Sequence, residues 1–340
     1  MNEKINSINE PNKLNSSAQE LTQELTNALN FKIYSSNDFP SYLPHLNAIY
    51  DDLLTQGKGF RAQLVQRVGH HLKLPHTVIH LLIQTIEFIH NASLLHDDLV
   101  DRSTLRRGKP TAWLRYTPEY AVLAGDYLLA RVMVNLSQFG NLQLLSFTSQ
   151  TISDLLEGEW LQDTLMKNWT VQLEKLDQVH QLKTASLFRW CLYAPFVAQN
   201  SPSAQLTEVL LEMGRLLGLL FQRSDDLLDF DVRNFEKKAV LGDLKSGYLN
   251  SFGAFLFKDL TEAQREAFQN AQNLNEIYQI IGMEYFNHHL SQFDALNKAL
   301  IERFSLFGDQ LSELLPVSQH ALVVELKLLC QALYWRGEES

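Results

Sequence analysis

Two acidic pentads carry the most direct chemical signal in this sequence. They are Asp97-Asp98-Leu99-Val100-Asp101 and Asp225-Asp226-Leu227-Leu228-Asp229, and each follows an apolar run with helical spacing. The first and fifth residues of a pentad lie about one turn apart on one helix face, so their carboxylates repel each other unless a cation lies between them. Magnesium takes one or two protein carboxylates, keeps several waters and completes its shell with phosphate oxygens. The two pentads together therefore predict a magnesium site for a phosphorylated ligand.

A single pentad has simpler interpretations. An acidic cluster can cap or solvate the end of a helix, and one pentad alone would favour that interpretation. Two matched copies, each after an apolar run, favour the metal site instead. An EF-hand calcium loop is disfavoured, because neither pentad continues into the glycine and the distal glutamate that such a loop needs.

Basic residues recur near the pentads in sequence. The segment Arg102-Ser-Thr-Leu-Arg106-Arg107-Gly108-Lys109-Pro110 is a basic loop with Gly and Pro, and paired arginines suit bidentate phosphate binding. The segment Gly57-Lys58-Gly59-Phe60-Arg61 offers a further lysine and arginine, although such a loop alone is more often a solvated turn. Lys183-Thr184 opens an apolar helical stretch, where the lysine could also extend its ammonium group to the surface.

One helix stripe leads up to the first pentad. His90, Asp97 and Asp101 differ by seven and eleven positions, nearly whole numbers of turns, and Ser93 lies on the same stripe one turn before Asp97. Ala92 and Ser93 are small and would leave room beneath a metal site, although tight helix packing explains them equally well. His90 taken alone is more often a buried core histidine.

The elements that must position these residues are helices. The 340 residues are 45% apolar, which is ample for a core, and strand-like alternation is essentially absent. Helical spacing recurs through about a dozen segments joined by short loops. We expect an all-α protein built as a single large helical bundle, in which residues 1–17 form a disordered lead-in and residues 18–340 the catalytic domain. Breaks are predicted at Gly57-Lys58-Gly59, Gly108-Lys109-Pro110, Gly140-Asn141, Ser201-Pro202-Ser203 and Gly242 to Gly247.

Charge and cysteine content exclude several classes of protein. A net charge of −10 argues against nucleic-acid binding. The two cysteines, Cys191 and Cys330, suggest no disulfide framework and are expected to be ordinary buried thiols in a reducing compartment. No run reaches the roughly 18 uninterrupted apolar residues of a membrane span, and the N-terminus lacks the order of a signal peptide. A cytoplasmic protein without an integral membrane segment is predicted.

Taken in order, the motifs resemble those of the trans-isoprenyl diphosphate synthases, the polyprenyl synthetase family, over about residues 45 to 250. The chain is most similar to the longer-chain bacterial members. The resemblance implies an all-α bundle of the isoprenoid synthase type with a central cavity, which joins isopentenyl diphosphate to an allylic diphosphate, and by analogy a homodimer. Besides the pentads, the matching elements are Gly57-Lys58-x-x-Arg61, Glu87-x-x-His90, Arg106-Arg107-Gly108, Ala124-Gly125-Asp126-Tyr127-Leu128-Leu129, Glu157-Gly158-Glu159, Lys183-Thr184 and Phe221-Gln222.

The resemblance also implies roles for individual residues. The isopentenyl diphosphate is expected to bind Lys58, Arg61, His90 and Arg107. The allylic diphosphate is expected to bind Arg106, Lys183, Thr184, Gln222 and Lys238. Mg²⁺ is expected to bind Asp97, Asp101 and Asp225, with Asp98, Asp226 and Asp229 in support, so that these six aspartates with Arg106 and Lys183 form the catalytic set. Ala92 and Ser93 would set the product length, and their small size predicts an all-trans product longer than farnesyl.

Departures and alternatives accompany this resemblance. After the second pentad the family has a second lysine and then Thr-Leu-Pro, whereas this chain has Tyr248 and then Leu249-Asn250-Ser251. Gly59 and Ala62 also replace residues that the family often has as a basic residue and a proline. A short-chain synthase making farnesyl or geranylgeranyl diphosphate is the alternative within the family. A class I terpene cyclase is disfavoured by the second pentad, a non-catalytic partner subunit by the two intact pentads, and a purely structural helical protein by the ordered motifs.

Overall fold

The computed structural model of the protein describes residues 39–53, 59–106, 108–231 and 240–334. Within these residues the predicted all-α fold is confirmed. The helices are α2 (Pro44–Leu53), α3 (Phe60–His71), α4 (His76–Val100), α5 (Ala112–Arg115), α6 (Pro118–Phe139), α7 (Leu142–Asp163), α8 (Leu173–His180), η2 (Gln181–Ala185), α9 (Ser186–Gln199), α10 (Ala204–Leu228), α11 (Gly242–Lys245), α12 (Ser251–Phe257), α13 (Glu262–Gln269), α14 (Leu274–Ile281), α15 (Met283–Leu314), η4 (Val317–Gln319) and α16 (His320–Tyr334).

The basic loop after the first pentad contains a short hairpin that the sequence did not predict. Its strands are β1 (Leu105–Arg106) and β2 (Lys109–Pro110), and they pair antiparallel, with Arg106 opposite Lys109. Gly108 has φ +76°, a conformation that glycine adopts at little cost. The hairpin holds the Arg106 backbone at a fixed place beside the end of α4.

The helix boundaries follow from side chains that cap them. Asn141 accepts a hydrogen bond from the Leu144 backbone N–H at the start of α7, and Ser203 accepts one from Leu206 at the start of α10. Gly140, with φ +80°, ends α6. The predicted breaks at Gly140-Asn141 and at Ser201 to Ser203 are therefore confirmed. The left-handed conformation of Gly140 ends one helix, and the side chains of Asn141 and Ser203 each cap the next.

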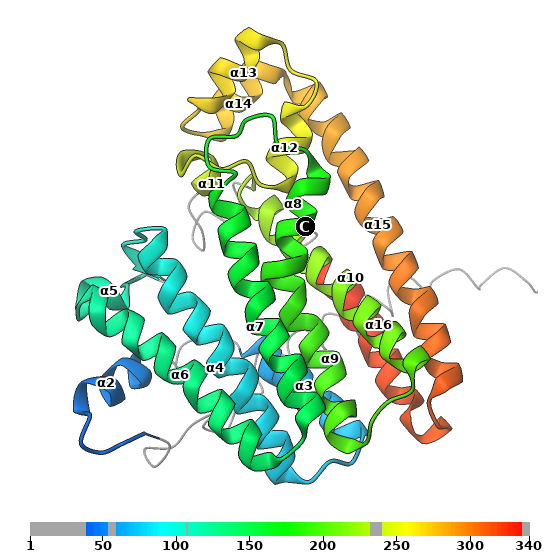
Figure 1. Ribbon diagram of the computed structural model, residues 1–340. Helices are drawn as coiled ribbons and strands as arrows, with labels where there is room; N and C mark the ends of the chain where they lie inside the picture. Colours follow the sequence, from blue (N-terminus) through cyan, green and yellow to red (C-terminus); the bar gives the residue numbers. More distant parts are fainter. Residues whose placement is uncertain (1–38, 54–58, 107, 232–239, 335–340) are drawn as a thin grey trace, which may run out of the picture.

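Two cores hold the helices together. The larger core includes residues of α2 to α7, α9, α10, α15 and α16, and the smaller one residues of α8 and α11 to α15. In Figure 1, α4, α6, α7 and α9 lie as a bundle, while α11 to α14, in yellow-green to yellow, cover its upper end and α15 runs down one side. The second pentad lies where the two cores meet, since Leu227 packs against both.

Helix α4 is the core helix that carries the first pentad. In the part of the chain that the structure describes, it alone is long and apolar enough to cross a membrane, and 67% of its most apolar stretch is buried inside the protein. It packs against α3, α6 and α9. Its hydrophobicity therefore has an explanation in the packing of the bundle.

A wide turn interrupts the long helical rod formed by α8 and α9. The π-helical segment η2 joins the two helices without a loop, and such turns are frequent at functional sites. Gly218 on α10 allows close packing here, because a Cβ atom added to it would lie 2.3 Å from the Cα atom of Ala185. The rod and α10 therefore touch backbone to backbone beside Lys183 and Thr184.

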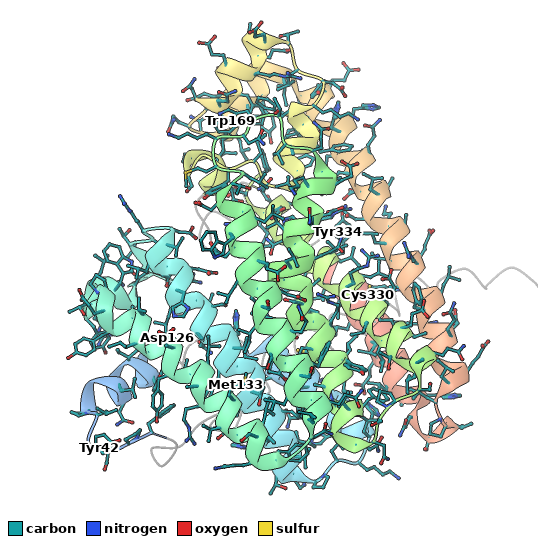
Figure 2. All side chains as sticks on the ribbon, in the orientation of Figure 1. Tyr42, Asp126, Met133, Trp169, Cys330 and Tyr334 are labelled. Carbon is teal, nitrogen blue, oxygen red and sulfur yellow. The ribbon has the colours of Figure 1, made fainter. Side chains whose placement is uncertain are left out.

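A buried polar network ties four helices together close to the second pentad. Arg223 on α10 donates to Asp177 on α8, at 2.6 and 3.2 Å, and to the side chain of Asn297 on α15, at 3.0 Å. Asn297 donates to the hydroxyl of Tyr334 on α16, which in turn donates to Asp294. Tyr334 is labelled with Cys330 on α16 in Figure 2. The C-terminal helix is thereby linked to the helix of the second pentad.

Several predictions concern residues outside those described. The lead-in at residues 1–17, the start of the domain at residue 18 and the binding roles of Lys58, Arg107 and Lys238 stay predictions for that reason. The prediction for the cysteines is confirmed: Cys191 and Cys330 are both free and buried, and burial raises the pKa of both thiols.

Candidate active site

The first pentad ends α4, and its carboxylates have separate surroundings. Asp98 is buried and receives a bidentate ion pair from Arg106, whose Nε and Nη2 lie 2.7 to 2.9 Å from its oxygens. Arg106 comes from β1, so this pair attaches the basic hairpin to the end of α4. Asp97 is half-buried and Asp101 lies at the helix end. Asp98 therefore holds the loop, and Asp97 and Asp101 remain the candidates to face a ligand.

Lys183 approaches the first pentad from the π turn η2. Its ammonium forms a close ion pair with Glu159 on α7 and lies 3.8 Å from an oxygen of Asp97. The lysine therefore does not extend to the surface, the alternative that the sequence left open. Burial raises the pKa of Asp97 to about 7, with Lys183 opposing this shift and Glu159 and Asp101 adding to it. The cluster thus holds more negative charge than Lys183 neutralises.

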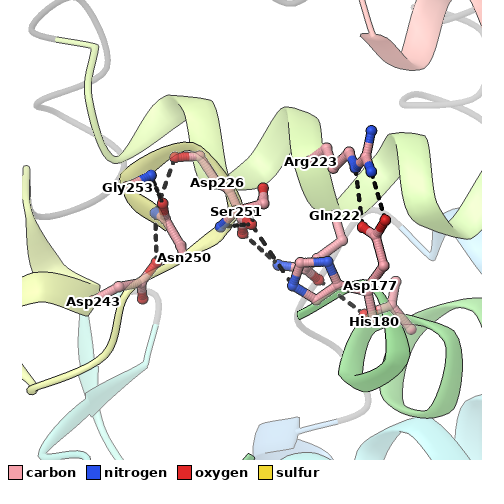
Figure 3. Close-up of polar contacts among 10 residues, drawn as sticks. Asp177, His180, Gln222, Arg223, Asp226, Asp243, Asn250, Ser251 and Gly253 are labelled. Carbon is pink, nitrogen blue, oxygen red and sulfur yellow. Dashed lines mark hydrogen bonds and ion pairs between the residues drawn. The ribbon is translucent and has the colours of Figure 1, made fainter. Parts of the chain in front are cut away.

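Thr184, the next residue, turns to the helix of the second pentad. Its hydroxyl donates to Gln222 at 2.8 Å, and the amide of Gln222 donates to Asp226 at 3.0 Å. Figure 3 shows Gln222 and Asp226 of this chain beside the Arg223 and Asp177 pair. Because Lys183 and Thr184 are consecutive, the π turn connects both pentads; that they form one metal-diphosphate site stays a prediction.

Two carboxylates of the second pentad hold the segment that follows it. Asp226 is buried and accepts hydrogen bonds from the hydroxyl and the backbone N–H of Ser251, at 2.6 and 2.9 Å. Asp229 is buried and accepts from the backbone N–H groups of Gly242 and Asp243, at 2.8 and 3.2 Å. Both carboxylates therefore anchor backbone, and their support of a bound metal stays a prediction. Asp225 is half-buried.

The residues that replace the Thr-Leu-Pro of the family have clear structural roles. Asn250 caps α12 by accepting from the Gly253 backbone N–H at 2.9 Å (Figure 3). Its amide donates to the Asp226 carbonyl and to the Asp243 carboxylate. Tyr248 is half-buried, and its pKa is raised by burial and by the charges of Asp101, Asp163 and Glu159. Tyr248 therefore lies close enough to the first pentad to feel the charge of Asp101.

A separate cationic position lies on α3. The guanidinium of Arg61 lies 3.4 Å from Nε2 of His90 and against the rings of Phe188 and Phe221, at 5.4 and 5.8 Å from their centroids. Its Nε atom is buried without a hydrogen-bond partner. Burial lowers the pKa of Arg61, and the charge of Glu87 opposes this shift. The structure thus brings together Arg61 and His90, both predicted for the isopentenyl diphosphate, and leaves a buried N–H available to an anion.

The two predicted chain-length residues, Ala92 and Ser93, differ in their burial on α4. Ala92 is fully buried, and Ser93 is half-buried with its hydroxyl donating to the His90 carbonyl at 2.9 Å. Phe88, one turn before Ala92 on the same face, is buried with Phe39, their ring centroids 6.0 Å apart. Phe39 also stacks on Tyr50 at 4.1 Å. This aromatic group lies beneath Ala92 and was not recognised in the sequence, because Phe39 and Tyr50 belong to distant segments.

The residues present fit a hard divalent cation. Among the residues that the structure describes, no three histidine, cysteine, aspartate or glutamate side chains converge as a complete metal site. Magnesium needs no such cage, since water and phosphate oxygens fill most of its shell. Burial raises the pKa of Asp97 and Asp101, the neighbouring carboxylates add to both shifts, and a bound cation would favour the ionised form of each. The donor set thus suits a metal that arrives with a phosphorylated ligand.

The chain is similar to curated proteins that are named as prenyl diphosphate synthases or prenyl transferases. The chain is 36% identical over 173 residues to a probable mitochondrial hexaprenyl pyrophosphate synthase of Yarrowia lipolytica, covering 49% of this chain and 38% of that protein. It is 36% identical over 180 residues to the chloroplastic solanesyl-diphosphate synthase 2 of Oryza sativa, covering 52% and 44%. It is 40% identical over 149 residues to a prenyl transferase of Synechocystis, covering 44% and 46%. The matches therefore span somewhat less than half the length of these relatives.

Solved structures share the fold over nearly the whole chain. A decaprenyl diphosphate synthase from Rhodobacter capsulatus matches with a TM-score of 0.73 at 25% identity, covering 95% of this chain and 98% of that one. A geranylgeranyl pyrophosphate synthetase from Pyrococcus horikoshii matches with a TM-score of 0.75 at 22% identity, covering 96% and 100%. The family model described as polyprenyl synthetase matches residues 43–281, which include both pentads. On these grounds the chain belongs to the polyprenyl synthetase family.

Proposed function

We propose that this protein is a trans-polyprenyl diphosphate synthase, which condenses isopentenyl diphosphate head-to-tail onto an allylic diphosphate. The observation that carries the proposal is the π turn, in which Lys183 contacts Asp97 of the first pentad and Thr184 reaches the second through Gln222. Two carboxylate sets with a lysine between them suit a metal-bound diphosphate. The named relatives support the same reaction.

The side chains divide the work of such a reaction. Asp97, Asp101 and Asp225 would hold Mg²⁺, which when bound neutralises diphosphate charge. Lys183 and Arg106 supply fixed positive charge to the diphosphate as its bond to the allylic carbon breaks. Arg61 and His90 hold the diphosphate of the second substrate, so that its double bond can attack the allylic cation. By their position in the motifs, Lys58 and Arg107 would also bind the isopentenyl diphosphate, and Lys238 the allylic diphosphate.

We further propose a product longer than farnesyl. Ala92 and Ser93 place no bulky side chain beside the first pentad, and the relatives named above include hexaprenyl and solanesyl synthases. One observation favours the short-chain alternative: Phe88 and its aromatic neighbours lie about 14 Å along α4 from Asp97, at 1.5 Å per residue. If the growing chain follows this face of α4, the aromatic group forms its floor.

The deciding experiment is incubation of the purified protein with Mg²⁺, labelled isopentenyl diphosphate and dimethylallyl, geranyl or farnesyl diphosphate, followed by analysis of product length. Long all-trans products would support both proposals. Products that stop at farnesyl or geranylgeranyl diphosphate would support the reaction and identify the aromatic group as the floor. No elongation with any starter would contradict the proposal that the protein is a synthase, and would favour a non-catalytic partner subunit.

The substitution Ala92→Phe is expected to shorten the product by several isoprene units, because a buried ring at this position fills the space beside the first pentad. The first condensation should proceed at a rate within about threefold of the wild type, since Ala92 belongs to the apolar core and has no group that could bind diphosphate. Product length and initial rate are measured in the same assay. Ala204→Phe, on the exposed start of α10, is the control. An unchanged product length would mean that the growing prenyl chain does not pass Ala92.

A homodimer is proposed as the working form. Helices α6 and α7 expose large apolar side chains: Leu123 is 61%, Leu156 50% and Trp160 79% exposed. Adjacent helices with this much exposed apolar surface are typical of an interface, and a second copy of the same chain would cover it. The cytoplasm stays the predicted compartment, although some relatives are named as mitochondrial or chloroplastic.

The substitution Leu123→Asp is expected to convert dimers to monomers, because it would bury a charge at the centre of the proposed interface. The mass in solution, measured by light scattering after gel filtration, distinguishes the two states. Val324→Asp is the control, since Val324 is 58% exposed on α16, away from α6 and α7. A monomeric wild type, or a dimer that survives Leu123→Asp, would contradict the proposal.

A further inference from the structure

Glu159 is a charged residue of the site to which neither the pentads nor the predicted substrate contacts assign a role. It lies on α7, its side chain is only 17% exposed, and its carboxylate forms a close ion pair with Lys183. Lys183 also lies 3.8 Å from Asp97. The one ammonium is therefore shared between a carboxylate of the first pentad and a carboxylate outside it.

The packing around this pair is shaped to bring Lys183 to α7. A Cβ atom added to Gly158 would lie 2.7 Å from Cγ of Lys183 and 2.9 Å from Cβ of Leu182. The absence of a side chain at Gly158 thus lets the lysine stem cross α7 and reach Glu159. The π turn on one side and a glycine on the other hold the lysine in this position.

The position conflicts with the proposed task of Lys183, which is to bind the diphosphate. While its ammonium lies between Glu159 and Asp97, it neutralises protein carboxylates. Glu159 lies in contact with Asp97, so a divalent cation at Asp97 would repel the ammonium and would also attract the Glu159 carboxylate, which weakens the hold of both carboxylates on Lys183. The lysine would then become available to an anion at the moment when the metal is bound.

We propose that Glu159 is a positioning residue that holds Lys183 away from free diphosphate until a divalent metal is bound at the first pentad. The inference rests on the proposed function and adds a coupling between two ligands to it. Metal and diphosphate then bind with positive cooperativity, because the metal frees the Lys183 ammonium and the diphosphate binds to it. Free diphosphate, released in every cycle, is bound weakly by the metal-free enzyme.

The test measures binding of inorganic diphosphate by calorimetry, in EDTA and then with Mg²⁺, using the wild-type protein and Glu159→Gln. Glutamine keeps the shape but removes the charge that retains Lys183. In EDTA, Glu159→Gln is expected to bind diphosphate about fivefold more tightly than the wild type, or better. With Mg²⁺ the two proteins should differ by less than about twofold, since the lysine is then released in both. Thermal melting confirms that both are folded.

Two controls separate retention of the lysine from a general loss of negative charge. Asp163→Asn removes a carboxylate one turn further along α7, which influences Tyr248 but has no ion pair with Lys183. It is expected to change diphosphate binding in EDTA by less than about twofold. In a Lys183→Met background, Glu159→Gln should have no effect, because a double-mutant cycle isolates the interaction of the two residues.

The outcomes distinguish this inference from the proposed function. Diphosphate binding by the wild type with Mg²⁺, but no gain in Glu159→Gln in EDTA, would overturn the role of Glu159 and leave the synthase in place. An equal gain in Asp163→Asn, or a gain that persists without Lys183, would overturn it too. No diphosphate binding by any protein, even with Mg²⁺, would overturn the proposed function and this inference together.

Discussion

Replacing Asp97 or Asp225 with asparagine is expected to lower turnover by about a thousandfold, because each removes a carboxylate proposed to hold the metal that neutralises the diphosphate. The two changes should differ in their effect on stability. Burial and the charges of Glu159 and Asp101 disfavour the ionised form of Asp97. Asp97→Asn should therefore raise the melting temperature of the metal-free protein while abolishing activity. Steady-state kinetics and thermal melting in EDTA measure the two effects.

The control for these substitutions is Asp309→Asn. Asp309 is 67% exposed on α15 and forms an ion pair with Lys327, so its substitution should change turnover by less than about twofold. Near-normal turnover of Asp97→Asn or Asp225→Asn would contradict a site made from both pentads. A fall in the melting temperature of Asp97→Asn would show that Lys183 outweighs the repulsion at this position.

Arg223→Ala is expected to lower the free energy of unfolding by about 3–5 kcal/mol, the typical cost of removing one partner from a buried ion pair. The Arg223 side chain is 7% exposed, and its loss would leave Asp177 and Asn297 without their strongest donors. Because Gln222 and Asp225 are its neighbours on α10, turnover should fall as well. Urea unfolding followed by circular dichroism gives the free energy.

Arg215 provides a matched control on the same helix. It makes a similar bidentate pair with Glu212, at 2.6 and 2.7 Å, but its side chain is 22% exposed and one turn of sequence separates the partners. Arg215→Ala should cost less than about 1 kcal/mol. Equal losses for the two arginines would mean that the four-helix network contributes nothing beyond a surface ion pair.

The fold and the principal site residues could be predicted because their signals are local. Each pentad lies at the end of one apolar helix, and spacing alone places His90, Asp97 and Asp101 on one face. Helix breaks at Gly140-Asn141 and before Ala204 come from capping side chains that act within three residues. The sequence left open whether Lys183 extends to the surface or joins the site. The contact with Glu159, which comes from a distant segment, shows that it joins the site.

Other features could not be predicted because they depend on segments far apart in the sequence. The aromatic group beneath Ala92 joins Phe39 and Tyr50 to Phe88, and nothing near any one of them indicates the others. The change from Thr-Leu-Pro to Asn250-Ser251 looked like a loss. In the structure Asn250 caps α12 and Ser251 holds Asp226, so the segment keeps its contact with the second pentad.

The π turn also fixes the phase of the rod that runs from Leu173 to Gln199. One extra residue in a helical turn rotates everything after it by about 100° relative to a continuous α-helix. The faces of α8 and α9 are therefore set against their neighbours by the length of residues 181–185. Because a π turn is an α turn with one residue more, deletion of Leu182 would close it to an α turn and leave Trp190 facing Thr148, to which its indole N–H donates at 2.9 Å. The π turn is therefore a place along this rod where the number of residues can fall by one without exchanging the core for the surface.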